Sequence, residues 1–132
     1  MESRKICKQY FDENKMKKPN QLEEILYAIE MHDDKDYKLN NNNPGSLLSI
    51  LCNADDLDAF GKIGIIRYTE IYLLRGININ ELSQKVIENL DKRFLNFERT
   101  YQSFENLHQK HQKRYSITKE FFEQLSKEVT LQ

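Results

Sequence analysis

Three aspartates lie close together in residues 53–61, which read Asn-Ala-Asp-Asp-Leu-Asp-Ala-Phe-Gly. Leu48, Leu51, Asp55 and Asp58 are spaced by three, four and three residues, so a helix would carry them on one face. An ionised carboxylate on a buried face is costly unless it meets a cation, a metal ion or several hydrogen-bond donors. We therefore expect Asp55 and Asp58 to have a divalent metal or an arginine as partner. The alternative is a helix end whose acids point into solvent.

Two further side chains could contribute to a site beside these acids. His32 lies three residues after Ile29, on the apolar face of the helix expected to begin near Leu22. A histidine there either makes hydrogen bonds in a core or cleft, or lines a substrate pocket. Arg67 could reach a phosphate through its bidentate fork or form a structural ion pair with Asp58. We select His32, Asp58 and Arg67 as candidate substrate-binding residues.

The stretch from Leu51 to Arg67 resembles the last motif of the HD-domain metal-dependent phosphohydrolases. In that all-helical superfamily the motif reads as an alanine-aspartate pair, then leucine-aspartate-alanine, a glycine and a Gly-Ile-x-Arg-like helix start. Asp55 matches the family's final metal-ligand aspartate. Residues 3–14 and 22–32 resemble the two helices that follow the family's His-Asp dyad. The resemblance implies a divalent metal (Mn, Fe, Co or Mg) held by Asp55, and hydrolysis of a phosphate ester or nucleotide.

The chain differs from the family in the region that supplies most of the metal ligands. The family's first histidine and its His-Asp dyad lie upstream of the region where this chain begins, and no histidine precedes His32. His32 and Asp33 could themselves be the dyad, but Asp55 follows Asp33 by only 22 residues, fewer than the family inserts there. Such a metal site needs several imidazole and carboxylate ligands. We therefore name no catalytic residue, leave open whether the chain is an enzyme, and expect a metal only if the missing ligands are supplied.

Helical patterns dominate the first half of the chain. Four glycines, two prolines and no tryptophan favour helices over sheet. We predict a helix over about residues 3–14. Asn20 and Glu23 form a capping box for a second helix, which cannot run far past Asp36. A third helix is expected to begin at Ser46.

The central segment is the most apolar part of the chain. Residues 63–74 carry Ile, Leu and Tyr on nearly all sides of a helix, which is typical of a helix at the centre of a fold. Gly61 and Gly64 mark either a break in the chain or a close approach between backbones.

The C-terminal half has a long, regular apolar pattern. Apolar and aromatic residues recur at spacings of three and four from Leu82 to Leu107, which predicts one long aromatic-rich helix, or two in line. The basic stretch 110–114 is expected to end this helix, near the negative pole of its dipole. Ser116 or Thr118 would then cap a last helix.

Composition places the chain among small all-α proteins. Its 132 residues are 39% hydrophobic, which suffices for one core, so we expect a single domain over 1–132 with an HD-like portion (1–75) and a helical extension (76–132). The 20 basic and 21 acidic residues argue against nucleic-acid or membrane-surface binding. No apolar run is long enough to span a bilayer. Two cysteines and the absence of an apolar leader predict a cytoplasmic protein.

Two functions from different classes follow from these observations. In the first, the chain is an HD-type phosphohydrolase-like protein that recognises a phosphorylated small molecule and is inactive alone because it is truncated, split or degenerate. In the second, it is a small all-α interaction module without catalysis. Such a module would associate with itself or with a complementary chain, since an incompletely covered apolar face invites association.

Overall fold

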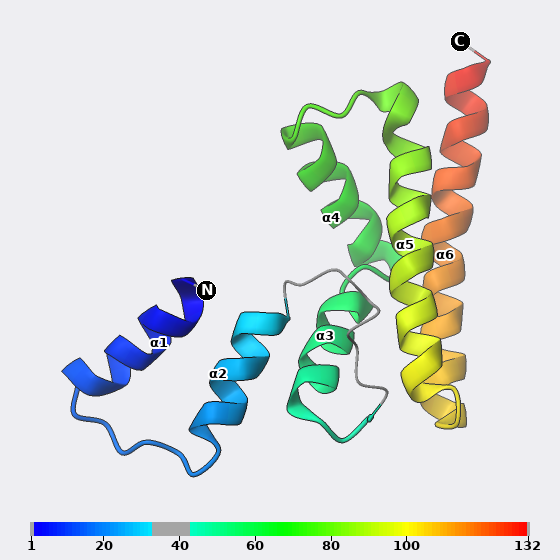
Figure 1. Cartoon of the computed structure of the whole chain (residues 1–132). Helices are drawn as coiled ribbons and strands as arrows, with labels where there is room; N and C mark the ends of the chain where they lie inside the picture. The colour runs from blue at the N-terminus through cyan, green and yellow to red at the C-terminus, as the bar shows by residue number, and fades with distance from the viewer. Residues whose placement is uncertain (1, 33–42, 132) are drawn as a thin grey trace. The chain divides into compact units, whose positions relative to one another are not determined.

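The computed structural model describes residues 2–32 and 43–131, and these residues form helices and no strand (Figure 1). The helices are α1 (Glu2–Glu13), α2 (Leu22–Met31), α3 (Leu47–Leu57), α4 (Gly61–Leu74), α5 (Ile79–Tyr101) and α6 (Glu105–Thr130). The predicted all-α class is therefore confirmed, and the two C-terminal helices, α5 and α6, are rich in aromatic residues. No helix in the described ranges is both long and apolar enough to cross a membrane.

The chain divides into two compact units, residues Met1–Cys52 (unit 1) and Asn53–Gln132 (unit 2). Helix α3 contains the boundary between them. The expectation of a single domain, with its HD-like portion ending at residue 75, stays a prediction. All three aspartates of the acidic motif belong to unit 2, together with the last turn of α3 and helices α4, α5 and α6.

In unit 1, helices α1 and α2 are held together by an arginine. The two Nη atoms of Arg4 lie 2.8 Å from a carboxylate oxygen of Glu30 and 3.1 Å from one of Glu23. The predicted capping box is wrong: Gln21 precedes α2 and its side chain makes no capping bond. The reason is that a backbone turn already engages this end, with the Leu22 N–H donating to the Pro19 carbonyl. Glu23 is thus free to pair with α1 instead.

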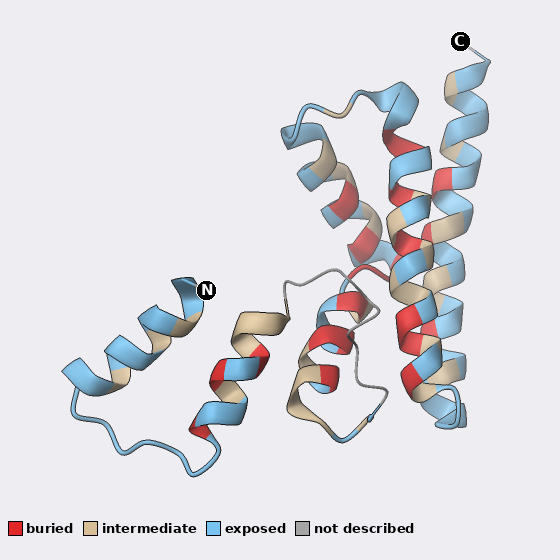
Figure 2. Cartoon of the chain, viewed as in Figure 1, coloured by how far each residue is buried: buried red, intermediate tan, exposed pale blue. Residues whose placement is uncertain are grey.

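The core of unit 2 is a hairpin of two antiparallel helices, α5 and α6. Asp91 of α5 contacts Tyr115 and Lys119 of α6, whereas Phe97, further along α5, contacts His108 and His111 near the start of α6. Figure 2 shows the buried positions concentrated where these helices meet. The fully buried side chains of this core are Phe60, Leu82, Val86, Leu90, Phe97, Phe122 and Thr118.

The prediction of one helix, or two in line, from Leu82 to Leu107 is wrong. The chain reverses at residues 102–104, and α6 begins at Glu105. Folding back lets the two apolar stripes bury each other: the Phe94 and Tyr115 rings stack with centroids 4.0 Å apart. The basic stretch 110–114 consequently lies inside α6 and does not end a helix.

Helix α4 packs against the hairpin through one side and is not central. Tyr68 is buried, whereas much of the opposite side is exposed, as Figure 2 shows by the pale blue along α4. The expectation that 63–74 forms the central helix is therefore wrong. Both glycines have the roles expected of them. Gly61 has φ +84° as the first residue of α4, where the chain breaks after α3, and a Cβ on Gly64 would lie 1.9 Å from the Ala59 carbonyl oxygen.

Candidate functional site

A buried carboxylate, that of Asp56, lies at the centre of the acidic motif. Its side chain is 5% exposed, and that of Arg93 on α5 is 13% exposed. Arg93 Nη1 lies 3.2 Å from Asp56 Oδ1, and Asn96 Nδ2 donates to Asp56 Oδ2 at 2.8 Å. These charge-assisted bonds fasten the end of α3 to the middle of α5. Asp56 was not among the residues selected from the sequence.

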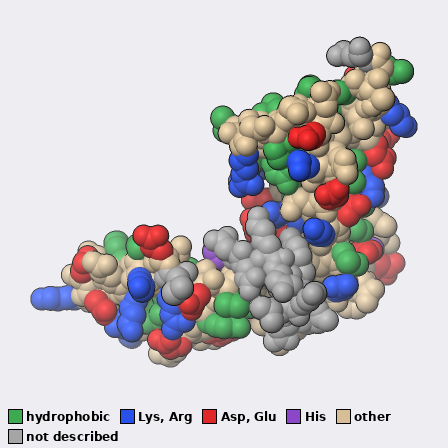
Figure 3. All heavy atoms as spheres, turned by 45° about the horizontal axis from the view of Figure 1, so that its top comes forward, with side chains coloured by type: hydrophobic (Ala, Val, Ile, Leu, Met, Phe, Trp, Pro, Cys, Tyr) green, Lys and Arg blue, Asp and Glu red, His purple; other side chains and the backbone are tan. Residues whose placement is uncertain are grey.

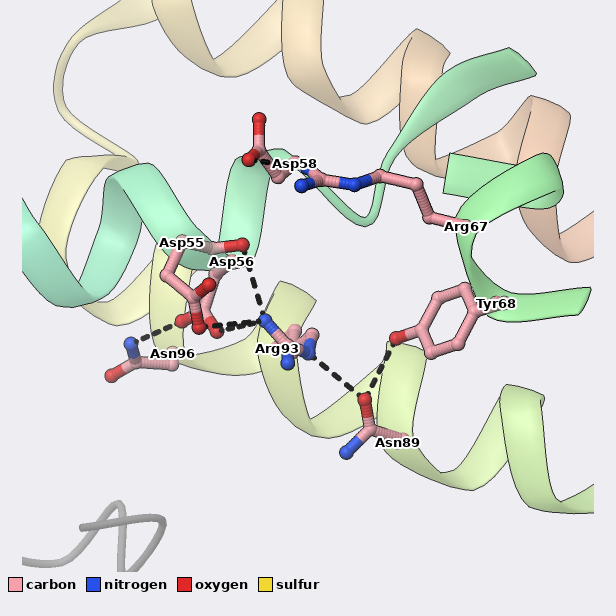
Figure 4. Close-up of polar contacts among 8 residues, drawn as sticks. All are labelled: Asp55, Asp56, Asp58, Arg67, Tyr68, Asn89, Arg93 and Asn96. Atoms are coloured by element: carbon pink, nitrogen blue, oxygen red, sulfur yellow. Dashed lines mark hydrogen bonds and ion pairs between the residues drawn. The ribbon is translucent and has the colours of Figure 1, made fainter. Parts of the chain in front are cut away.

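Arg93 also organises the contacts around this carboxylate (Figure 4). Its Nη1 donates to the backbone carbonyl of Asp55 at 3.1 Å and to the Asp55 carboxylate at 3.2 Å. Its Nε donates to Asn89 Oδ1 at 2.9 Å, and the Tyr68 hydroxyl donates to the same oxygen at 2.8 Å. One guanidinium therefore links α3 to α5, and through Asn89 it is connected to α4.

The two carboxylates selected from the sequence are more exposed than expected. The side chains of Asp55 and Asp58 are 57% and 64% exposed, so they do not extend a buried stripe. Helix α3 ends at Leu57, and the chain turns before Asp58, so helical spacing no longer places Asp58. The expectation that an arginine could serve as partner is confirmed: Asp55 pairs with Arg93, and Asp58 pairs with Arg67 at 2.5 Å. For Arg67, the ion-pair alternative is thus observed.

A small cavity of about 140 Å³ opens beside these ion pairs. It is lined by Asp55, Asp58, Ala59, Gly64, Arg67, Tyr68, Ile71 and Arg93. The two carboxylates at this cavity each meet a guanidinium, and the described residues contain no group of three or more His, Cys, Asp or Glu side chains that could hold a metal. The donor set present in these residues does not fit a catalytic metal ion, which needs several convergent ligands.

His32 belongs to unit 1 and lies just beyond the end of α2. Its backbone N–H donates to the Ala28 carbonyl, and its Nδ1 lies 2.7 Å from the Ile29 carbonyl oxygen. This is a hydrogen-bonded histidine, one of the two readings that the sequence left open. Its role in substrate binding stays a prediction. Asp33, the second member of the alternative dyad, lies outside the described residues.

Two side chains of α6 hold the corner between α3 and α4. The Gly61 N–H donates to the Thr118 hydroxyl at 2.7 Å, and Arg114 Nη2 donates to the Phe60 carbonyl at 2.7 Å. Thr118 is fully buried in the interior of α6, so the expectation that Ser116 or Thr118 caps a last helix is wrong. The contact of residue 118 with residue 61 depends on the hairpin turn, which the sequence pattern did not indicate.

The histidines of α6 take part in structural contacts. His111 is buried, and Arg114 Nη1 lies 3.0 Å from its Nδ1. Burial lowers the pKa of His111 below its ordinary value, and the charges of Arg114 and Lys110 lower this pKa further. His108 Nε2 lies 3.1 Å from Glu98 Oε1, across the hairpin turn.

The outer side of α4 carries an unusual concentration of exposed apolar residues. We define the α4 face as Ile63, Ile66, Ile71, Leu73 and Leu74, all of which are exposed. Ile66 is 62% exposed and Leu74 is 82% exposed. Arg67 and Glu70 lie between these residues in sequence and are exposed as well. On the visible surface of unit 2, Figure 3 shows hydrophobic side chains beside charged ones.

Comparison with known proteins assigns no family to this chain. No protein-family model, no curated protein and no solved structure matches it.

Proposed function

We propose that this chain is a protein-interaction module that binds another polypeptide through the α4 face. The observation that carries the proposal is the exposure of five large aliphatic side chains on one short helix. Extended exposed apolar patches with polar neighbours are characteristic of interaction sites in soluble proteins. A binding partner would remove this apolar surface from water, which is the main favourable contribution to most protein association.

The packing of α4 within unit 2 supports this proposal because it does not use the α4 face. The inner side of α4 contributes Gly64, which approaches Ala59, and Tyr68, which is buried and bonded to Asn89. The ends of the helix are fixed by other groups: Thr118 and Arg114 hold its start, and Gly76 follows its end with φ +81°. Ile71 also lines the cavity beside Asp55, but the contacts of unit 2 described above involve no other member of the α4 face.

The experiment uses variants that change the surface but not the core. A tagged chain is expressed in its source cells, the co-purifying polypeptide is purified, and the binary dissociation constant is measured. Ile66→Glu should weaken binding about tenfold or more, because it loses apolar burial and places a charge in the interface. Leu95→Glu, at an exposed leucine of α5, is the matched control and should bind as the wild type does. Equal effects of the two variants, or no binding partner at all, would contradict the proposal.

A second candidate function rests on the cavity beside Asp55 and on the resemblance to HD-type phosphohydrolases. Arg67 and Arg93 both line this cavity, and guanidinium groups bind phosphate oxygens in a bidentate manner. In this proposal the cavity receives the phosphate group of a small molecule, and Arg67 exchanges its bond to Asp58 for the phosphate. The proposal includes no catalytic step, because the described donor set does not fit the metal of the family.

Calorimetric titration with inorganic phosphate and a nucleoside monophosphate tests this second candidate, with and without Mn²⁺. The candidate predicts saturable phosphate binding that Arg67→Met weakens and Arg75→Met preserves, since Arg75 follows α4 and does not line the cavity. Absence of binding, or equal losses in both variants, would rule it out. Binding that requires Mn²⁺ and Asp55 would instead favour a complete HD-type site.

A further inference from the structure

We infer that the partner of the α4 face is a second copy of this chain, with the two α4 helices packed antiparallel about a twofold axis. The inference rests on the proposed function and specifies its partner. It rests on the order of apolar and charged residues along α4. When two α4 helices run antiparallel, this order places apolar residues opposite apolar residues and the positive charge opposite the negative one.

The α4 face has apolar ends and a charged middle. Ile63 lies near the start of the helix and Leu74 at its end, eleven residues or about three turns later, so both lie near the centre line of the exposed side. Arg67 and Glu70 lie one turn apart between them, near the same line. The sequence of properties along the line is therefore apolar, positive, negative, apolar.

An antiparallel twofold arrangement pairs these groups favourably. If the axis passes midway between Arg67 and Glu70, Arg67 lies opposite Glu70 of the second copy, and the reverse pair forms by symmetry. The same register places Ile63 opposite Leu74 of the second copy. A twofold interface requires this self-complementarity, because the same patch must serve both copies. A parallel arrangement would instead oppose Arg67 to Arg67 and Glu70 to Glu70, which is repulsive.

The remaining members of the α4 face fit the same register. Ile66 and Leu73 lie seven residues apart along one edge of the face. The twofold axis places Ile66 of one copy within one helical turn of Leu73 of the second copy. Ile71 flanks Arg67 on the other edge. Arg67 keeps its bond to Asp58 in this arrangement, since a guanidinium has five N–H donors and can serve two carboxylates.

Sedimentation equilibrium with charge exchange tests the pairing. The wild-type chain should show a dimer whose dissociation constant rises about tenfold or more in Arg67→Glu and in Glu70→Arg. The double variant should regain most of the affinity, because the exchanged charges again face opposite charges. Lys85→Glu, at an exposed lysine of α5, is the control and should not change the dissociation constant. Failure of the double variant to regain affinity, with helix content preserved by circular dichroism, would overturn the antiparallel register.

Cysteine cross-linking tests the register without altering either charge. In a background with Cys7→Ser and Cys52→Ala, the double variant Ile63→Cys and Leu74→Cys should form a disulfide-linked dimer on mild oxidation. Either single variant should not, because the two copies of one position lie about 16 Å apart along the helices, too far for a disulfide. Cross-linking of the single variants would indicate the parallel arrangement and overturn the inference.

The outcomes separate this inference from the function on which it rests. A chain that stays monomeric at all concentrations overturns self-association. If Ile66→Glu nevertheless abolishes binding of a different purified polypeptide, the proposed interaction module stands with another partner. If the chain is monomeric and no polypeptide distinguishes Ile66→Glu from Leu95→Glu, both proposals fail.

Discussion

Arg93 Nη1 lies 3.2 Å from Asp56 Oδ1, and both side chains are largely removed from water. The pair joins the last turn of α3 to the middle of α5. The most buried carboxylate of the acidic motif therefore meets an arginine of the same unit, and Asn96 donates to its second oxygen. This arrangement makes the motif a structural junction in unit 2, beside the small cavity.

Loss of this junction should be far more costly than loss of the neighbouring surface pair. Arg93→Met removes the cation from beside a buried carboxylate and should destabilise the protein by about 3–5 kcal/mol. Arg67→Met breaks the exposed pair with Asp58 and should cost no more than about 1 kcal/mol. Urea unfolding followed by circular dichroism measures both. Similar losses of unfolding free energy in the two variants would show that the burial of Asp56 does not determine the cost of losing its arginine partner.

The close approach at the start of α4 predicts a contrast between two glycines. A Cβ on Gly64 would overlap the backbone of Ala59, which no side-chain movement can relieve, so Gly64→Ala should cost more than about 3 kcal/mol. Gly76 has φ +81° and open space around it, so Gly76→Ala should cost about 1–2 kcal/mol from backbone strain alone. Denaturant unfolding gives both values, and the reverse order would contradict the packing described for α4.

The hydroxyl of Thr118 should control the exchange of one backbone amide. Thr118→Val keeps the shape but removes the acceptor of the Gly61 N–H, at a cost of about 1–3 kcal/mol. Thr118→Ser keeps the hydroxyl and serves as control. Hydrogen exchange measured by NMR should show faster exchange of the Gly61 amide in the valine variant, with protection retained in the serine variant. Unchanged protection in Thr118→Val would mean that another group accepts this bond.

Acidification should weaken unit 2 through His111. Its folded-state pKa lies below the ordinary value of about 6.5 because of burial and of the charges on Arg114 and Lys110. Between the two pKa values the unfolded chain binds more protons, so stability is full above about pH 6.5 and is lost as the pH falls towards the folded-state pKa.

Thermal unfolding at several pH values, compared between variants, tests the role of His111. The wild type should lose more stability between pH 7 and pH 5 than His111→Gln, which cannot titrate. An identical acid dependence in the wild type and His111→Gln would assign the effect to other groups.

The helices themselves could largely be predicted from the sequence, because their apolar spacing is regular. The hairpin turn could not, since residues 102–104 contain neither glycine nor proline and the apolar spacing runs through them unbroken. This turn also determines which residues meet at the start of α4. Thr118 and Arg114 reach the start of α4 only because α6 folds back along α5.

The sequence predicts that carboxylates of the acidic motif need partners, with arginine among them. It does not predict which carboxylate is buried. Helical spacing selected Asp55 and Asp58, but α3 ends at Leu57, and Asp56 points towards α5. Residues 63–74 are apolar on nearly all sides, which predicts a central helix, but this pattern does not show which of these side chains the rest of unit 2 covers.

One comparison of dissociation constants tests most directly whether the α4 face, and not the acidic motif, binds the partner polypeptide. Binding of the wild type, Ile66→Glu and Asp55→Asn is measured for the polypeptide that binds the chain, whether a second copy or another protein. We predict that Ile66→Glu raises the dissociation constant about tenfold or more, equivalent to at least about 1.4 kcal/mol, while Asp55→Asn leaves it unchanged. Loss of binding in Asp55→Asn with wild-type binding in Ile66→Glu would contradict binding through the α4 face and favour binding at the cavity beside Asp55.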